Sequence, residues 1–179
     1  MRIIAGDFKG RRLEAPDDNQ IRPTTDKVKE AMFSIIAAEV PDSICVDLFS
    51  GTGNLGLEAI SRGASKCYFG DNSRQSIGII KRNIEHCKAE SKSTVIPGDY
   101  SKVLEYIKEK ADVFLIDPPY EAGYYENCFK RIKELNILSE EGIIVAEHRS
   151  DLELSESIEG FTLIKERRYG NIVLSIYGR

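Results

Sequence analysis

Histidine is scarce in this sequence, since His86 and His148 are the only two among 179 residues. Two histidines are too few for a histidine-based metal site or a convincing Ser-His-Asp triad. The four cysteines show no C-x-x-C spacing, and two of them lie in apolar runs. We therefore expect no metal, and we expect buried thiols in a reducing cytoplasm rather than disulfides.

Long apolar runs are absent as well, and none approaches the length needed to cross a membrane. The start, MRIIAGDF, is too short and too charged for a signal peptide, so we expect no membrane partner. The net charge of −4 gives no overall attraction to nucleic acid. The two ends differ from the body, because residues 1–12 and 165–179 each hold four basic residues against one acidic residue. On charge alone, both ends are interpreted as solvated faces.

The stretch from Ile44 to Gly63 has the pattern of a buried strand, a glycine turn and a helix. Residues 44–49 form an apolar run of the length typical of a strand packed on both faces. Three glycines with G-x-G-x-x-G spacing follow: Gly51, Gly53 and Gly56. Glycine permits positive φ and lets a ligand approach the backbone. With Asn54 as the helix cap, we expect free amides at the helix start to form a nucleotide-sized shelf.

Strand and helix patterns alternate from Ile44 to Ala146, which predicts a doubly wound α/β sheet of parallel strands. Residues 161–177 then have the pattern of two antiparallel strands, and two short strands are expected at the N-terminus. The expected parallel strands are 44–49, 67–69, 94–96, 113–116 and 143–146, the N-terminal strands are 2–5 and 11–15, and helices are expected near 25–40, 73–87, 103–107 and 129–135.

Aspartates end the predicted strands. Asp47 lies near the end of the first, and Asp71, Asp99 and Asp117 end the next three. Ligands of such sheets bind beyond the carboxyl ends of the strands, so we expect these carboxylates to converge on one rim. Asp71 lies 20 residues after Gly51, where a carboxylate can bind both ribose hydroxyls. Asp47 is costly inside a buried strand unless it has a partner.

An acidic rim favours S-adenosylmethionine over a dinucleotide. A pyrophosphate would be repelled by four carboxylates, and the glycine turn holds no Arg or Lys to compensate. S-adenosylmethionine instead carries a sulfonium and an ammonium, which carboxylates attract. Asp71 can bind its ribose, and Asp99 can accept from its adenine amino group.

The segment Asp117-Pro118-Pro119-Tyr120 predicts the chemistry. Each proline fixes φ and removes a donor, which leaves a stiff edge rich in acceptors. The Asp117 carboxylate and the Pro118 carbonyl suit the two N–H donors of an exocyclic amino group. Accepting both hydrogens localises the nitrogen lone pair, and Tyr120 offers a flat face for stacking the base. Catalysis would then rest mainly on positioning and electrostatics.

In this order and spacing, the motifs DLFSGTG, Asp71, Gly98-Asp99 and Asp-Pro-Pro-Tyr resemble class I S-adenosylmethionine-dependent amino-methyltransferases. The head, RIIAGDFKGRRL followed by RPTTDKVKEAMF, and the tail, RRYGNIVLSIY, resemble the RsmD family of bacterial 16S ribosomal RNA guanine-N2 methyltransferases. The resemblance covers nearly the whole chain. One departure is Gly70, where relatives usually have an apolar residue, and we expect it to weaken the second strand.

The resemblance implies a Rossmann-like class I methyltransferase fold. Its doubly wound, mostly parallel sheet would have seven strands, with an antiparallel C-terminal strand and a small N-terminal β-hairpin. Residues 1–20 would be an RNA-docking hairpin, and residues 21–179 the methyltransferase domain. The implied activity moves a methyl group from S-adenosylmethionine to N2 of one specific guanine in 16S ribosomal RNA. The partner would be the small ribosomal subunit or its assembly intermediate, the enzyme a monomer, and its location cytoplasmic.

Carried over by position, the resemblance and the motifs assign three groups of site residues. The base would be held by Asp117, Pro118, Pro119 and Tyr120. The cofactor would be held by Asp47, Phe49, Ser50, Gly51, Thr52, Gly53, Asn54, Gly56, Asp71, Asn72, Asp99 and Tyr100. The RNA would be held by Arg2, Lys9, Arg11, Arg12, Arg22, Thr24, Thr25 and Lys27. Tyr124 and Tyr125 are interpreted as core or lid residues, and Glu147 as a structural partner.

Other functions remain open. An adenine-N6 methyltransferase acting on DNA or RNA would use the same Asp-Pro-Pro-Tyr segment, although little chain remains for a DNA recognition region. A nicotinamide-dependent oxidoreductase would lack a second substrate domain and a plausible proton donor. A non-catalytic RNA-binding module would leave Asp117 and the glycine turn without a purpose.

Overall fold

The computed structural model describes residues 1–17, 25–119 and 123–179. Its helices are α1 (Asp26–Ile35), α2 (Asn54–Ser61), α3 (Arg74–Cys87), the 3-10 turn η1 (Glu90–Lys92), α4 (Tyr100–Tyr106) and α5 (Tyr124–Leu135). Its strands are β1 (Ile44–Asp47), β2 (Lys66–Asp71), β3 (Ser93–Pro97), β4 (Ala111–Ile116), β5 (Leu138–Arg149), β6 (Ser157–Ile158), β7 (Phe161–Tyr169) and β8 (Ile172–Gly178).

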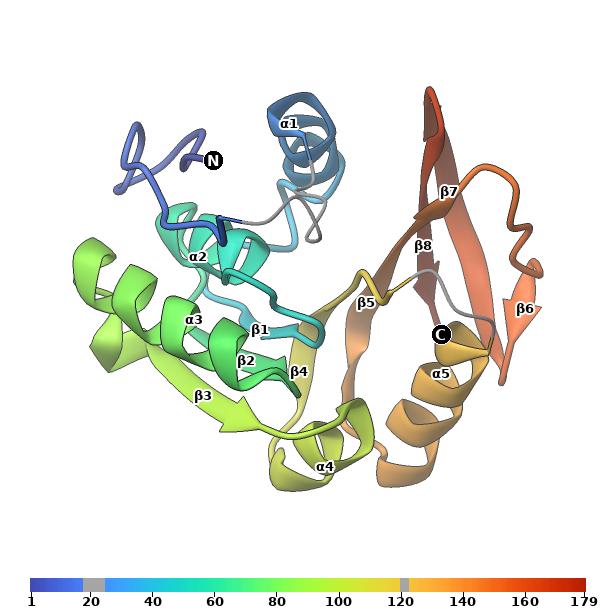
Figure 1. Ribbon diagram of the computed structural model, residues 1–179. Coiled ribbons are helices and arrows are strands. Elements are labelled where there is room, and N and C mark those ends of the chain that lie inside the picture. The colour runs from blue at the N-terminus through green and yellow to red at the C-terminus, as the bar shows by residue number, and fades with distance from the viewer. Residues whose placement is uncertain (18–24, 120–122) are drawn as a thin grey trace.

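The strands form one sheet in the order β3-β2-β1-β4-β5-β8-β7-β6 (Figure 1). Strands β1 to β5 run parallel, whereas β8, β7 and β6 extend the sheet by antiparallel pairs. The predicted doubly wound α/β fold is therefore confirmed. The described part of the sheet has eight strands rather than seven, because β6 pairs with β7 over two residues. A strand of that length is too short to show an alternating pattern in the sequence.

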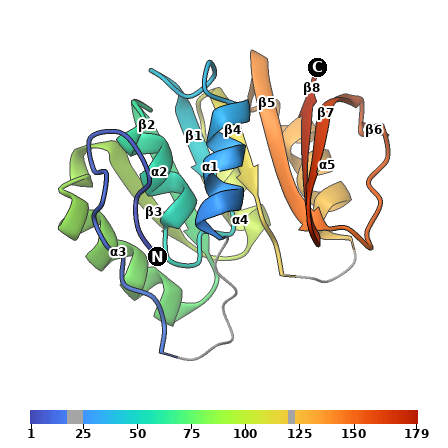
Figure 2. The same ribbon diagram turned by 90° about the horizontal axis from the view of Figure 1, so that it is seen from above.

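Two apolar layers cover the sheet, one on each face (Figures 1 and 2). Helices α1, α2 and α3 pack on one face over a core that includes Phe33, Leu57 and Phe69. Helices α4 and α5 pack on the other face over a core that includes Phe114 and Phe129. The central strands β1, β2 and β4 are buried along nearly their whole length, as expected for parallel strands covered by helices on both faces.

Local signals in the sequence define most helix starts. Ser73 caps α3 by accepting from the Ser76 N–H at 3.3 Å, and Thr25 caps α1 by accepting from the Val28 N–H at 3.3 Å. Helix α1 ends at Ile35 rather than near residue 40, and Val40 reaches the core from the segment that follows the helix.

The N-terminal arm (residues 1–17) forms less strand than the sequence predicts. The expected strands 2–5 and 11–15 are reduced to one antiparallel bridge between Arg2 and Arg12. Backbone bonds from the Ile3 N–H to the Arg11 carbonyl and from the Leu13 N–H to the Met1 carbonyl hold the hairpin together. Other backbone groups of the arm bond to side chains of α2, which takes the place of a longer ladder.

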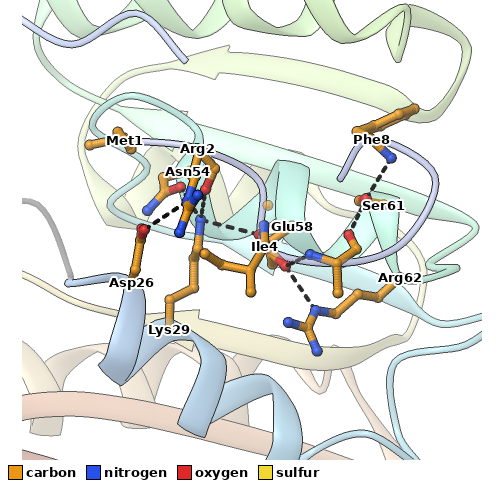
Figure 3. A network of polar contacts seen from close by, with 12 residues as sticks. Met1, Arg2, Ile4, Phe8, Asp26, Lys29, Asn54, Glu58, Ser61 and Arg62 are labelled. Atoms are coloured by element: carbon orange, nitrogen blue, oxygen red, sulfur yellow. Dashed lines mark hydrogen bonds and ion pairs between the residues drawn. The ribbon is translucent and has the colours of Figure 1, made fainter. Parts of the chain in front are cut away.

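A buried ion pair joins the N-terminal arm to α1 and α2 (Figure 3). Lys29 Nζ lies 3.1 Å from Glu58 Oε2, and both side chains are fully buried. Lys29 also donates to the Arg2 carbonyl, and Glu58 accepts from the N–H groups of Ile4 and Ala5. Burial lowers the pKa of Lys29, and the nearby Glu58 opposes that shift. The arm is thus fixed by charged groups that are satisfied inside the protein.

Among the described residues, no helix is long and apolar enough to cross a membrane. All four cysteines are buried and free.

Candidate active site

The carboxyl ends of β1 to β5 form one edge of the sheet, which we call the carboxyl rim. Asp47 ends β1, Asp71 ends β2, Asp99 follows β3 and Asp117 follows β4. The parallel register pairs Asp47 with Phe69 and with Leu115, and Asp71 with Pro97. The expected convergence of the four aspartates on one edge follows from this register.

The turn between β1 and α2 requires glycine for two reasons. Gly51 and Gly53 have φ of +58° and +81°, a region that other residues rarely adopt. At Gly56, a Cβ atom would lie 2.3 Å from the ring of Phe69, so α2 could not approach β2 as closely. The glycine spacing therefore serves both the turn and the packing of the helix behind it.

Three amides of this turn and helix start are not free, which narrows the expected shelf of free amides. The Gly51 N–H donates to Asp71 Oδ2, and the Gly56 N–H donates to Asp47 Oδ2, each at 2.9 Å. The Gly53 N–H donates to the Ser50 carbonyl at 2.8 Å. Carboxylates thus occupy positions at which a pyrophosphate would need donors. The turn does not suit a dinucleotide.

Asn54 is not the helix cap. Gly53 takes the N-cap position in a left-handed conformation, and Asn54 is the first residue of α2. Its Oδ1 accepts from Lys29 Nζ at 2.7 Å, so the side chain faces the buried ion pair (Figure 3). Gly53 has no side chain that could cap the helix, and the Gly56 N–H of the first turn is instead satisfied by Asp47 Oδ2.

Asp71 anchors two backbone groups at the end of β2. Its Oδ2 accepts from Gly51, and its Oδ1 accepts from the Ser73 N–H at 2.9 Å. The side chain is half-buried, so it faces the rim while bound to both amides. Gly70 lies within β2 and pairs with Ile96, and a Cβ at this position would lie 2.7 Å from the Val103 methyls. Close packing of α4 thus accounts for glycine here, and its cost to the stability of β2 stays a prediction.

The raised pKa of Asp47 reflects its burial and shows that several carboxyl groups lie close together at the carboxyl rim. Its side chain is 2% exposed, and burial raises its pKa to about 7, with further rises from the charges of Asp117 and Asp71. The Gly56 N–H opposes this shift. Because three carboxyl groups act on one another here, a bound group of positive charge would be favoured. This is the observation by which a sulfonium-bearing cofactor fits the rim.

The remaining cofactor candidates lie around the glycine turn and the start of α4. Asp99 is exposed and caps α4, with its Oδ1 accepting from the Lys102 N–H at 2.9 Å. Ser50 is buried and donates to the Asp47 carbonyl at 2.6 Å. Thr52 is buried and contacts Met1 Sδ at 3.0 Å, whereas Asn72 is exposed.

Three aromatic rings meet beside the rim. The ring centroids of Phe49 and Tyr124 lie 5.6 Å apart, and those of Tyr100 and Tyr124 lie 5.9 Å apart. All three side chains are half-buried. Phe49 and Tyr100 are among the expected cofactor residues, whereas Tyr124 is expected only as a core or lid residue and not as part of the site. Its position as the first residue of the helix after the Asp-Pro-Pro-Tyr segment is the signal that could have identified it.

The segment after β4 carries the predicted base-binding residues. Asp117 is half-buried, Pro118 is buried and Pro119 is exposed, so the segment reaches from the core to the surface. Tyr120 lies outside the described residues. Tyr125 is a core residue, since its hydroxyl is buried and donates to the Glu147 carbonyl at 2.6 Å.

The arm cations predicted to bind RNA divide into two places. Arg2 and Arg12 pair across the arm close to Met1, which contacts the glycine turn at the rim. Arg11 lies at the carboxyl end of α3, away from the rim, where it donates to the Cys87 carbonyl at 2.6 Å. Lys9 lies near Arg11 in the turn of the N-terminal arm. Figure 2 shows the loop of the arm apart from the N-terminus. The structure therefore brings only Arg2 and Arg12 to the rim.

The other RNA candidates belong to α1 and the segment before it. Thr25 and Lys27 are exposed at the start of α1, and Arg2 is paired with Asp26 at 3.1 Å. Arg22 and Thr24 lie outside the described residues.

No three His, Cys, Asp or Glu side chains gather as a metal site within residues 1–17, 25–119 and 123–179.

Sequence reasoning missed the Lys29–Glu58 pair, because charged residues in a helical pattern are usually solvated.

Comparison with known proteins gives matches over the whole chain. The sequence model of the family "Conserved hypothetical protein 95" matches residues 1–178. YlbH of Bacillus subtilis, by name a candidate rRNA methyltransferase, is 35% identical over 99% of this chain and 98% of its own. Ribosomal RNA small subunit methyltransferase D of Escherichia coli is 30% identical over 100% of this chain and 90% of its own.

The solved structure of yhhF from Escherichia coli, by name a candidate methyltransferase, superimposes with a TM-score of 0.87 at 27% identity. The match covers 100% of this chain and 97% of that chain.

Proposed function

The chain belongs to the family of conserved hypothetical protein 95, the RsmD family, and from this membership we propose that it is a ribosomal RNA methyltransferase. In its finer form, the proposal is transfer of a methyl group from S-adenosylmethionine to N2 of one guanine in 16S ribosomal RNA. The names of relatives that match the whole chain support the rRNA substrate. We place the reaction in the cytoplasm, carried out by a monomer on the small ribosomal subunit or its assembly intermediate.

The observation that carries the choice of cofactor is the acidic rim with its occupied amides. S-adenosylmethionine, when bound, supplies a methyl group on a positively charged sulfur. Gly51 and Gly53 would let it approach the backbone, and Asp71 would accept from its ribose hydroxyls. Each carboxylate oxygen has two lone pairs, so Asp71 can bind its two backbone amides and the hydroxyls together. Asp99 would accept from the adenine amino group, beside Tyr100 and Phe49. Asp47, which is buried, would act by fixing the turn through Gly56.

The chain's own contribution to chemistry is placed at Asp117 and Pro118. The Asp117 carboxylate and the Pro118 carbonyl would each accept one N–H of the guanine amino group. This orients the amino nitrogen and holds its lone pair outside the plane of the base. Asp117 then stabilises the positive charge that develops on that nitrogen, before the proton is lost. Tyr120 would stack the base.

The test is the identity of the modified nucleoside. The protein is incubated with labelled S-adenosylmethionine and unmodified small-subunit RNA, either free or in assembled particles. The RNA is then digested, and the labelled nucleoside is identified by mass spectrometry. We expect N2-methylguanosine. N6-methyladenosine would instead support the adenine-N6 alternative, and no labelled nucleoside on either substrate would contradict the proposal.

A further inference from the structure

Strand β7 carries an uncovered basic surface. Lys165, Arg167 and Arg168 are all exposed, in the chain segment whose charge alone indicated only a solvated face. Arg167 donates to the Glu166 carbonyl and Arg168 to the Gly170 carbonyl, contacts that leave the positive charges uncompensated. Within the described part of the chain, none of these three cations forms an ion pair.

The pairing register of β7 with β8 places two of these cations on the face of the sheet that α1 covers. Lys165 lies opposite Ile176, and Arg167 lies opposite Leu174. Directly opposite residues of antiparallel strands point to the same face of the sheet. Ile176 and Leu174 belong to the core beneath α1, α2 and the N-terminal arm, so Lys165 and Arg167 lie on that side.

Glu166, the one acidic residue between them, lies on the other face. It is paired with Ser175 and accepts from the Ser175 hydroxyl at 3.0 Å. Its charge is therefore separated by the sheet from Lys165 and Arg167.

The same register brings the end of β7 to the carboxyl rim. Strand β5 ends at Arg149, which pairs with Ile172, and Ile172 pairs with Tyr169 at the end of β7. Because β5 is parallel to β1 and β4, the β7–β8 turn lies at the edge where Asp117 lies. Figure 2 shows this turn and the segment that follows β4 on one edge of the molecule. Arg149 itself is neutralised by Asp151 at 2.7 Å and is not counted among the free cations.

We propose that Lys165 and Arg167 bind the phosphate backbone of the ribosomal RNA. They form a second docking site, on the side of Asp117 away from the N-terminal arm. The proposal rests on the proposed function, because it assumes an RNA substrate at the rim. Charge complementarity identifies the occupant, since two uncompensated cations on an exposed strand match a polyanion. On the near side Arg12 would contact the RNA backbone, beside Arg2 in its exposed pair with Asp26, so the RNA would be held across the target base.

The test compares two variants of equal charge change. Lys165→Gln/Arg167→Gln removes the two cations and keeps side chains of similar length over the apolar core. Lys92→Gln/Lys108→Gln is the control, because both lysines are exposed and precede β3 and β4 at the opposite edge of the sheet. The affinity of each for deproteinised small-subunit RNA is measured over a range of salt concentrations. Thermal unfolding and S-adenosylmethionine affinity check that both variants are folded.

The Lys165→Gln/Arg167→Gln variant should reduce the slope of log K against log salt by about 1.4 to 1.8, because each phosphate contact contributes about 0.7 to 0.9. The control should keep the parental slope. Equal slopes for the Lys165→Gln/Arg167→Gln variant and the control would overturn the inference. Methyl transfer by the parent is measured in parallel. If the parent transfers methyl groups but the Lys165→Gln/Arg167→Gln variant keeps the parental salt slope, only the second docking site is contradicted. A parent that transfers no methyl group contradicts the proposed function.

Discussion

At the scale of single residues, the site depends on carboxylates that serve the protein's own backbone. Asp47 and Asp71 each bind an amide of the β1–α2 turn, and the same groups give the rim its negative charge. The glycine turn therefore fits a cationic ligand because its donors are already used. Sequence patterns place both aspartates correctly, but they do not show that their oxygens bind Gly56 and Gly51.

Asp71→Ala is expected to weaken S-adenosylmethionine binding. The substitution removes a charged acceptor for the ribose and releases the amides of Gly51 and Ser73. A hydrogen bond to a charged group contributes about 1.5–3 kcal/mol, or roughly 10- to 150-fold in affinity. Calorimetry measures the change, and affinity equal to that of the parent would remove Asp71 from the site.

Asp47→Asn should change how stability depends on pH. Because the folded protein raises the pKa of Asp47 to about 7 from 3.8, the folded state binds a proton more tightly than the unfolded state. That contribution is complete below about pH 4 and is lost as the pH rises through 7. The variant stays neutral, so above pH 7 it should gain stability relative to the parent by up to about 4 kcal/mol, at about 1.4 kcal/mol per pKa unit.

The measurement is the free energy of unfolding of both proteins, from denaturant titrations between pH 4 and 8. Groups remote from the rim titrate alike in both proteins, so the difference reports Asp47 together with its coupling to Asp117 and Asp71. A difference that stays constant across this range would show that Asp47 is ionised throughout.

At the scale of elements, the arm and helices α1 and α2 are joined by one buried ion pair. Lys29→Met would leave buried Glu58 with Arg62, 2.9 Å from its Oε1, as the remaining cation, so the loss of stability should reach at most about 3–5 kcal/mol, the cost of a fully broken buried pair. Lys27→Met, on the exposed side of the same helix, is the matched control and should stay within about 0.5 kcal/mol of the parent. Urea unfolding tests both. Equal stability of the two variants would show that the pair does not hold the arm.

The sequence predicts elements much better than the contacts between them. Apolar runs, together with glycines at the turns, predict where β1 to β5 and their helices lie, because each of these signals lies within or next to the element itself. The Lys29–Glu58 pair could not be predicted, since the partners are far apart in the chain and each belongs to a pattern typical of solvent exposure. The Asn54 cap was wrong for the same reason, because Lys29 draws that side chain away from the helix start.

At the scale of the whole molecule, basic groups flank an acidic rim. Arg2 and Arg12 lie at the rim end of the arm, whereas Lys9 and Arg11 lie at its far end. The sequence shows only that all four residues are basic. Their different distances from the rim follow from the course of the arm in the structure. We therefore expect their contributions to RNA binding to differ.

Arg2→Gln/Arg12→Gln should lower the salt slope of RNA binding by about 0.7–0.9 for each lost phosphate contact. Lys9→Gln is the control, because it removes a cation of the same arm away from the rim. Binding is followed by fluorescence anisotropy with deproteinised small-subunit RNA at several salt concentrations. A larger effect from Lys9→Gln than from the rim pair would place the RNA along the far end of the arm instead.

The claim on which the account depends is that Asp117 stabilises the reacting amino group. Single-turnover methyl transfer to small-subunit RNA or particles tests it, with S-adenosylmethionine affinity measured in parallel. Glu140→Ala is the control, because it removes an exposed carboxylate near the start of β5. Asp117→Ala should lower the rate by about 10²–10³, as removal of one electrostatic stabiliser does, with cofactor affinity retained. Asp117→Asn should fall between Ala and the parent. An Asp117→Ala enzyme that turns over as fast as the Glu140→Ala control would contradict the account.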